Sequence, residues 1–291
     1  MPSSRSGTLR SGGSYLSRRN RISSVRANLI LLLACVVVLA PCYFLFLGSF
    51  KSVNEFFSSP FGLPRSWSLQ NFRDAWSEAN LSAAFTNSVL ITAASVLLST
   101  SVACAASYAI ARLRLRGAST MQMFLLAGLV LPTQLIVIAA FIEMRWLGLV
   151  GTIWPMVLLY TASSIPLGVL FLVGFFRTIP AALTEAAELD GASQWTQFVL
   201  IVLPLMKAPI FTVALLNSVW IWNDFFGPLI FANNSDLQTA PLAILNFYGA
   251  DSTNYGLIFA GVVMSALPVV VVYVALTRQF INGVMAGGLK G

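Results

Sequence analysis

The sequence VGTIWPMVLLYTASSIPLGVLFLVGFF, residues 150–176, runs directly into RTIPAALTEAAELDGA, residues 177–192. The first stretch holds no charged residue and is long enough to cross a bilayer as a helix, which takes about 20 apolar residues. The second stretch places Glu185, Glu188 and Asp190 close together, and carboxylates at bilayer depth cost about 3 kcal/mol each. This junction predicts a membrane span followed by a polar segment, Pro180–Pro209, that lies outside the lipid.

The rest of the chain has the composition of a multi-pass membrane protein. Of its 291 residues, 57% are hydrophobic and 9% are charged, whereas soluble domains carry about 25% charged residues. Lipid offers the backbone no hydrogen-bond partners and no alternating barrel pattern occurs, so each span has to be helical. We therefore expect an all-α membrane protein with about six transmembrane helices. These are Ala27–Phe50, Asn87–Ala111, Met121–Ile142, Val150–Phe176, Ala208–Phe231 and Tyr255–Leu276.

Lysine and arginine residues give the orientation of these spans. With the N-terminus in the cytoplasm, thirteen of the 17 Lys and Arg residues fall on the cytoplasmic side and four on the outer side. Cytoplasmic loops are enriched in these residues, so we expect both termini in the cytoplasm. The same distribution accounts for the net charge of +7 without a nucleic-acid partner. Residues 1–26 form a polar, arginine-rich cytoplasmic tail that we expect to be disordered, and residues 27–291 form the transmembrane domain.

Under this orientation the loop 177–209 lies in the cytoplasm between the fourth and fifth spans. Gly191 after Asp190 predicts the end of one short helix, because glycine takes the left-handed conformation of a C-terminal cap. Ser193 predicts the N-cap of a second helix, Gln194–Leu203. The apolar face of that helix comprises Trp195, Phe198, Val199 and Val202. Two interpretations fit this pattern: a thin, bent helical hairpin that docks into a groove on a partner, or a loop that only joins two spans.

The order of residues in this segment is Glu185-Ala186-Ala187, then Asp190-Gly191-Ala192, then Leu203-Pro204. It resembles the EAA coupling loop of binding-protein-dependent ABC importers. The chain is similar to the carbohydrate-type permease subunit of these importers, of which the second permease of the maltose transporter is an example. The resemblance covers nearly the whole chain. It continues through Ser49-Phe50-Lys51, Asn71-Phe72, Leu131-Pro132, Leu147-Gly148-Leu149, Trp222-Asn223-Asp224-Phe225 and Gly287-Gly288.

The resemblance implies a function and a set of partners. The chain is expected to be the permease subunit of an ATP-driven importer in the cell (inner) membrane, moving sugar from an extracytoplasmic binding protein to the cytoplasm by alternating access. The implied partners are a second homologous permease, two ATPase subunits, the sugar-binding protein and membrane lipid. ATP and Mg²⁺ are expected on the ATPase, since this chain has no Gly-x-x-x-x-Gly-Lys-[Ser/Thr] loop. The residues implied to contact the ATPase are Glu185, Ala186, Ala187, Asp190, Gly191, Ala192 and Lys290.

Polar and aromatic residues inside the spans are candidates for the substrate pathway, because such residues are costly in lipid. Most of them fall in the fifth span, next to Gly227-Pro228, which predicts a break or kink. Aromatic faces and directional hydrogen bonds suit a sugar, but packing between helices uses the same residue types, and both interpretations stay open. The candidates are Asn217, Trp220, Trp222, Asn223, Asp224 and Gln134.

Two other classes of protein fit less well. A secondary transporter or channel for a small polar solute, working alone, would show an inverted repeat and paired buried charges, and no clear repeat is present. An enzyme would need a nucleophile and a base or a metal site, but the chain has no histidine. Its cysteines, Cys35, Cys42 and Cys104, lie in apolar runs without Cys-x-x-Cys spacing. We therefore expect neither a metal site nor an enzyme activity in the chain itself.

Overall fold

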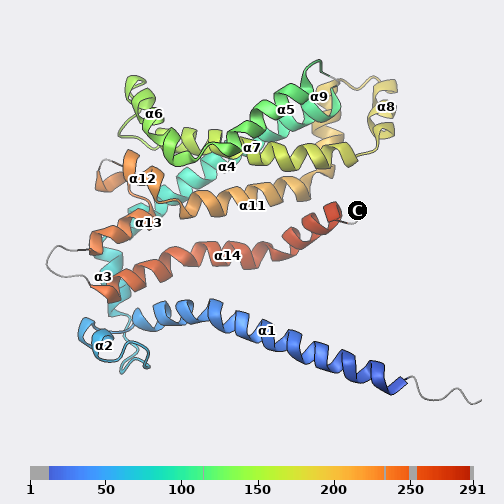
Figure 1. Cartoon of the computed structure of the whole chain (residues 1–291). Coiled ribbons are helices and arrows are strands. Elements are labelled where there is room, and N and C mark those ends of the chain that lie inside the picture. Colours follow the sequence, from blue (N-terminus) through green and yellow to red (C-terminus); the bar gives the residue numbers. More distant parts are fainter. Residues whose placement is uncertain (1–12, 114, 233, 249–253, 289–291) are drawn as a thin grey trace, which may run out of the picture.

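The computed structural model describes residues 13–113, 115–232, 234–248 and 254–288. Within these ranges the chain is helical and contains no β-strand, so the prediction of an all-α fold is confirmed. The long helices lie roughly side by side (Figure 1). Helix α8, Ala181–Leu189, lies at one end of the molecule, and α3, Gln70–Glu78, lies at the opposite end.

Four of the described helices are each long and apolar enough to cross a membrane. They are α1 (Gly13–Gly48), α4 (Leu81–Arg112), α7 (Trp154–Thr178) and α14 (Tyr255–Gly288). Two further spans exist if each of two bent helix pairs counts as one. The first pair joins α5 (Ala118–Ala127) and η1 (Gly128–Val130) to α6 (Thr133–Trp146) with a bend of 100°, and the second joins Gln194–Leu205 to α11 (Lys207–Asn223) with a bend of 76°. The described chain therefore has four helices that could each span a membrane, or up to six such spans if both bent pairs count. The second pair differs from the predicted fifth span, 208–231, because it includes Gln194–Leu205, which the sequence analysis placed outside the lipid.

A proline breaks the predicted third span, 121–142, which was expected to be one continuous helix. Leu131 is extended, with φ −82° and ψ 116°, and Pro132 follows it with ψ 130°. A residue before proline is disfavoured in the helical region, and proline has no N–H to continue the helix. The continuous helix was therefore the wrong expectation, and α5–η1 and α6 meet at a sharp bend.

The predicted fifth span, 208–231, is also interrupted, but not at the expected position. Helix α11 ends at Asn223, Asp224 is extended with ψ 132°, and α12 spans Phe226–Phe231. Gly227 and Pro228, which were expected to break the helix, lie inside α12. The Asp224 carboxylate accepts a hydrogen bond from the Gly227 N–H at 2.8 Å, so it starts α12 in the manner of a capping residue.

Small residues bring α4 and α7 together along the centre of the bundle. Ser95, Ser99 and Ala103 of α4 are buried, and Ser95 Oγ donates to the Val157 carbonyl of α7 at 3.4 Å. A side chain on Gly168 of α7 would place its Cβ 2.6 Å from the Cβ of Ala103. Close approach of this kind, with hydrogen bonds between helices, is typical of packing inside membranes.

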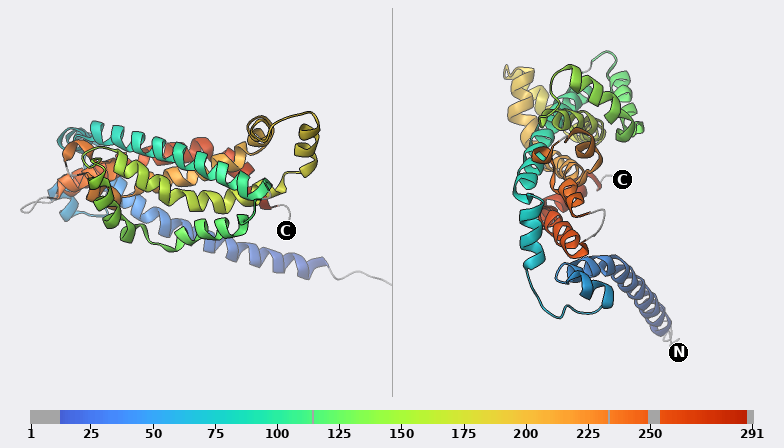
Figure 2. Two further views of the ribbon diagram at one scale, coloured as in Figure 1. Left: turned by 90° about the horizontal axis from the view of Figure 1, so that it is seen from above. Right: turned by 90° about the vertical axis from the view of Figure 1, so that its left-hand side faces the viewer.

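Helix α1 lies apart from the bundle over most of its length (Figures 1 and 2), and its side chains are exposed from Ala27 to Tyr43. It begins at Gly13, inside the segment 1–26 that was expected to be disordered; residues 1–12 lie outside the described residues. Its C-terminal end is anchored by Lys51, whose fully buried Nζ donates to the Ser59 and Pro60 carbonyls at 2.9 Å each.

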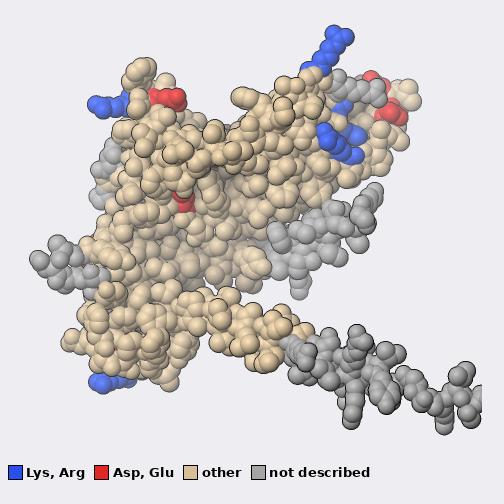
Figure 3. Space-filling view, viewed as in Figure 1, with Lys and Arg blue, Asp and Glu red and all other residues tan. Residues whose placement is uncertain are grey.

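The charged side chains of the face seen in Figure 3 gather at the two ends of the bundle, and the surface between them is almost entirely uncharged. One end carries α8. The other carries a set of short helices: α2 (Val53–Ser58), α3, α12, η3 (Ser235–Leu237), α13 (Ala240–Ala243) and η4 (Ile244–Phe247). This distribution is typical of a protein whose middle lies in lipid.

Candidate functional site

The polar segment forms a hairpin that stands out from one end of the bundle, as the left view of Figure 2 shows for the olive-coloured region around α8. Its first helix, α8, follows an extended elbow in which Ile179 has ψ 127° and Pro180 has ψ 131°. Glu185, Ala186 and Glu188 on this helix are exposed, as is Asp190 at its end. Ala187, 8% exposed, is the buried residue of α8. Helix α8 packs against the segment Gln197–Val202.

The bend of the hairpin is formed by Gly191, which has φ +83°, as the sequence predicted. The Ala192 N–H donates to the Ala187 carbonyl at 2.9 Å, and the Gly191 N–H donates to the Glu188 carbonyl at 3.0 Å. This pair of bonds closes the helix end in a Schellman motif. Ser193 then caps the second helix, since its Oγ accepts from the Thr196 N–H at 3.2 Å, and this prediction is also confirmed.

The second half of the hairpin is attached to the bundle through its apolar face. The chain continues from α9 (Gln194–Thr196) through a π-helical turn (Gln197–Val202) to α10 (Leu203–Leu205). Phe198 and Val202 are buried, and the centres of the Phe198 ring and of the Tyr108 ring on α4 lie 4.7 Å apart. Trp195 and Leu189 are 71% and 90% exposed, so the tip of the hairpin presents apolar side chains beside the carboxylates. Lys290, assigned to the same contact, lies outside the described residues.

A second group of candidates meets at the break between α11 and α12. Asp224 Oδ2 accepts two hydrogen bonds, one from the Tyr160 hydroxyl at 2.7 Å and one from the Gly227 N–H at 2.8 Å. The rings of Tyr160 and Trp220 meet edge to face with their centres 5.8 Å apart. Asp224, Trp220 and Asn223 line a cavity of about 550 Å³ together with Leu215, Leu216, Val219 and Tyr273.

The remaining candidates lie elsewhere. Trp222 is buried and donates from Nε1 to the Ser265 carbonyl of α14 at 3.0 Å, so it joins two helices. Asn217 is 2% exposed, and its Nδ2 has no hydrogen-bond partner among the described residues. Gln134 is exposed on α6 and does not line the cavity beside Asp224. The structure thus brings three of the six candidates together: Trp220, Asn223 and Asp224.

Tyr160 was missed by the sequence analysis. It is 1% exposed on α7, and a phenol hydroxyl group inside a span without charged residues before Arg177 is a signal that the sequence offered. Its partner lies 64 positions along the chain, and nothing in the local sequence predicts that pairing.

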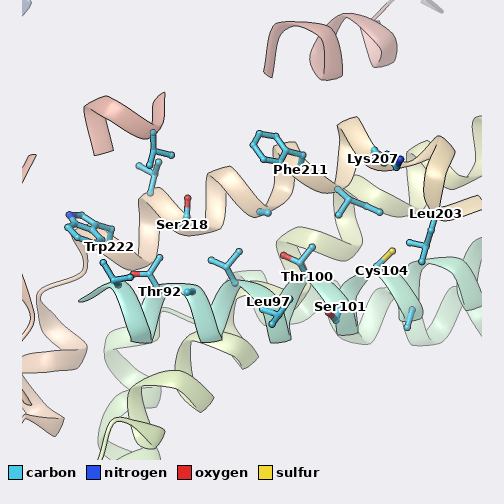
Figure 4. A pocket seen from close by; sticks show the side chains of 18 of the residues that line it. Thr92, Leu97, Thr100, Ser101, Cys104, Leu203, Lys207, Phe211, Ser218 and Trp222 are labelled. Atoms are coloured by element: carbon cyan, nitrogen blue, oxygen red, sulfur yellow. The ribbon is translucent and has the colours of Figure 1, made fainter. Parts of the chain in front are cut away.

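A larger cavity of about 1150 Å³ runs along α4, α11 and α14 (Figure 4). Most of its lining is apolar, and the polar side chains along it include Thr92, Thr100, Ser101 and Ser218. Trp222 lies toward one end of it and Lys207 toward the other (Figure 4). Among the described residues, no three His, Cys, Asp or Glu side chains are grouped so that they could hold a metal ion.

Comparison with known proteins gives a consistent result. The family model described as "Binding-protein-dependent transport system inner membrane component" matches residues 96–280. The Diacetylchitobiose uptake system permease protein NgcG of Streptomyces coelicolor is 32% identical over 266 residues, which cover 91% of this chain and 88% of that protein. The Melibiose/raffinose/stachyose import permease protein MelC of Bacillus subtilis is 34% identical over 278 residues, covering 94% of this chain and 100% of that protein.

Among solved structures, one similar chain comes from the crystal structure of a bacterial ABC transporter involved in the import of the acidic polysaccharide alginate. It aligns with a TM-score of 0.77 and covers 90% of this chain and 98% of that chain. The two sequences are 20% identical, so this similarity shows the fold alone.

Proposed function

The chain belongs to the binding-protein-dependent transport system inner membrane components, and on this premise we propose that it is the membrane-spanning permease subunit of an ATP-driven importer for neutral oligosaccharides or disaccharides. The observation that carries the proposal is the family match over residues 96–280, which include both the hairpin and the break at Asp224. The names of NgcG and MelC concern the uptake of di-, tri- and tetrasaccharides, and both proteins align with nearly this whole chain.

The hairpin is the proposed contact with the ATPase. Its tip combines the exposed carboxylates of Glu185, Glu188 and Asp190 with the exposed apolar side chains of Leu189 and Trp195. Buried apolar anchors surrounded by polar groups are characteristic of protein interfaces. We place this end of the bundle, with both chain termini, in the cytoplasm. There a pair of ATPase subunits binds ATP and Mg²⁺, while a second permease completes the pathway through the membrane.

The substrate pathway is proposed to pass the cavity beside Asp224. Within the described part of the chain, the Asp224 carboxylate accepts both of its hydrogen bonds through Oδ2, and the Asn223 amide donates from Nδ2 to the Val219 carbonyl at 2.7 Å. Asp224 Oδ1 and Asn223 Oδ1 are then acceptors suited to sugar hydroxyl groups. Trp220, 40% exposed, offers an aromatic face next to them.

Co-purification tests the assignment. The chain is tagged and expressed from its native chromosomal locus. Purification through the tag from detergent-solubilised membranes should recover a second permease and an ATPase. ATP hydrolysis by the recovered complex should rise when an extracytoplasmic binding protein loaded with sugar is added. Recovery of the chain alone, together with solute transport by the purified chain without ATP, would instead support a secondary transporter or channel.

A further inference from the structure

Arg112 lies in the last turn of α4 and reaches the elbow between α7 and α8. Its Nη1 donates to the Ile179 carbonyl at 2.9 Å, and its Nη2 lies 3.5 Å from the Pro180 carbonyl and 3.4 Å from Thr184 Oγ1. One guanidinium group therefore contacts both residues of the elbow and the first turn of α8. These contacts join segments separated by 67 to 72 positions in the sequence.

The elbow itself is a weak connection. Ile179 and Pro180 are both extended, so no helical hydrogen bonds run through them from α7 to α8, and Pro180 has no N–H. Along α8 the side chains are exposed except for Thr184, which is half-buried, and Ala187, which is buried. Without further contacts, α8 could change its angle to α7 at the cost of rotating a few backbone bonds.

The last turns of α4 hold the hairpin at a second point as well. Tyr108, one turn before Arg112, has its hydroxyl 3.4 Å from Gln194 Oε1, and its ring packs on Phe198. Arg112 thus contacts the hairpin where it leaves α7, and Tyr108 contacts it just after the bend. Helix α4 also packs along α7 and α11 and lines the larger cavity, so it extends from the hairpin into the membrane part.

We propose that Arg112 is a positioning residue that fixes the angle of α8 to the bundle, so that movement of the hairpin is passed to α4 as well as to α7. This inference rests on the proposed function, in which α8 contacts the ATPase. The planar guanidinium donates in several fixed directions at once, whereas a lysine ammonium in the same place acts as a point charge on a flexible stem. Arg112→Lys therefore keeps the charge but loses the fork that spans the elbow.

The experiment compares Arg112→Lys with wild type in the complete complex reconstituted in liposomes, with binding protein and sugar present. Three quantities are measured: the amount of ATPase retained, the rate of ATP hydrolysis, and the sugar taken up per ATP hydrolysed. We expect the ATPase to be retained and the uptake per ATP to fall at least about fivefold, the lower end of usual coupling between sites. The control, Arg116→Lys, changes an exposed arginine at the same end of the bundle and should leave all three quantities unchanged.

Unchanged uptake per ATP in Arg112→Lys overturns the proposal. Loss of the ATPase from that complex also overturns it, because Arg112 would then serve assembly. If Arg112→Lys does not accumulate, Thr184→Val is measured in its place, because it removes the hydroxyl group that Arg112 Nη2 contacts on α8. A lowered uptake per ATP in Thr184→Val supports the proposal, and a wild-type value rejects it. A wild-type complex that lacks an ATPase or sugar uptake would instead contradict the proposed function, so the two failures are distinguishable.

Discussion

The hydroxyl group of Tyr160 offers a direct test of how the helix break at Asp224 is held. In Tyr160→Phe the buried ring and its edge contact with Trp220 remain, and only the hydrogen bond to Asp224 Oδ2 is lost. A hydrogen bond to a charged group contributes about 1.5–3 kcal/mol. Because the Gly227 N–H still donates to the same oxygen, we expect the lower part of that range, about 1.5–2 kcal/mol.

A loss of this size corresponds to a fall in melting temperature of about 3–8 °C for a chain of this length. Thermal unfolding of the detergent-purified chain, followed by tryptophan fluorescence, measures it. Tyr248→Phe is the matched control, because Tyr248 is 58% exposed whereas Tyr160 is 1% exposed. In a double-mutant cycle with Asp224→Asn, the effect of Tyr160→Phe should shrink, since the two side chains share one interaction. Equal melting temperatures for the two Tyr→Phe variants, or an additive cycle, would refute the reasoning.

Three further changes have defined outcomes. Gly227→Ala would place a Cβ 2.6 Å from the Tyr160 hydroxyl, so thermal unfolding should show a loss of about 1–3 kcal/mol from overpacking, and an unchanged melting temperature would contradict the geometry. In Gly191→Ala the added Cβ meets no atom within 4 Å, but an alanine has to adopt the φ of +83°. The free energy of unfolding should therefore fall only by the cost of a left-handed residue, about 1–2 kcal/mol. Loss of the whole fold, seen by size-exclusion chromatography, would contradict this account of the bend. Lys51→Met leaves two backbone carbonyls without their donor, at about 1–3 kcal/mol each, and limited proteolysis should cut the 52–70 segment faster than in wild type; an equal rate would show that the ammonium group does not hold it.

Local signals explain what the sequence analysis predicted correctly. The turn at Gly191 and the cap at Ser193 depend on residues within a few positions, and both appear as expected. The single long spans follow from the length and composition of apolar runs alone. Pro132 was also a local signal for a bend. The prediction of a continuous helix over 121–142 followed the apolar composition of that segment instead of the proline, and it was wrong.

Interactions between distant segments explain the rest. The position of the second break depends on Asp224 capping α12 while Tyr160 holds the same oxygen from another helix. Trp222, a candidate for the pathway, lines the larger cavity and also bonds the α14 backbone through Nε1, a contact that no local pattern reveals. Likewise, the sequence analysis used Arg112 only as one of the cytoplasmic charges that orient the spans. Its contact with the elbow depends on the packing of α4 against α7.

The central claim is that this chain moves sugar only as part of an ATP-driven complex. ATP-dependent uptake by liposomes holding the complex purified through this chain tests it most directly. With a labelled sugar and the binding protein that recognises it outside the liposomes, we predict that sugar accumulates inside only when ATP is enclosed on the hairpin side. Entry at the same rate without ATP, or uptake by the isolated chain, would contradict the account.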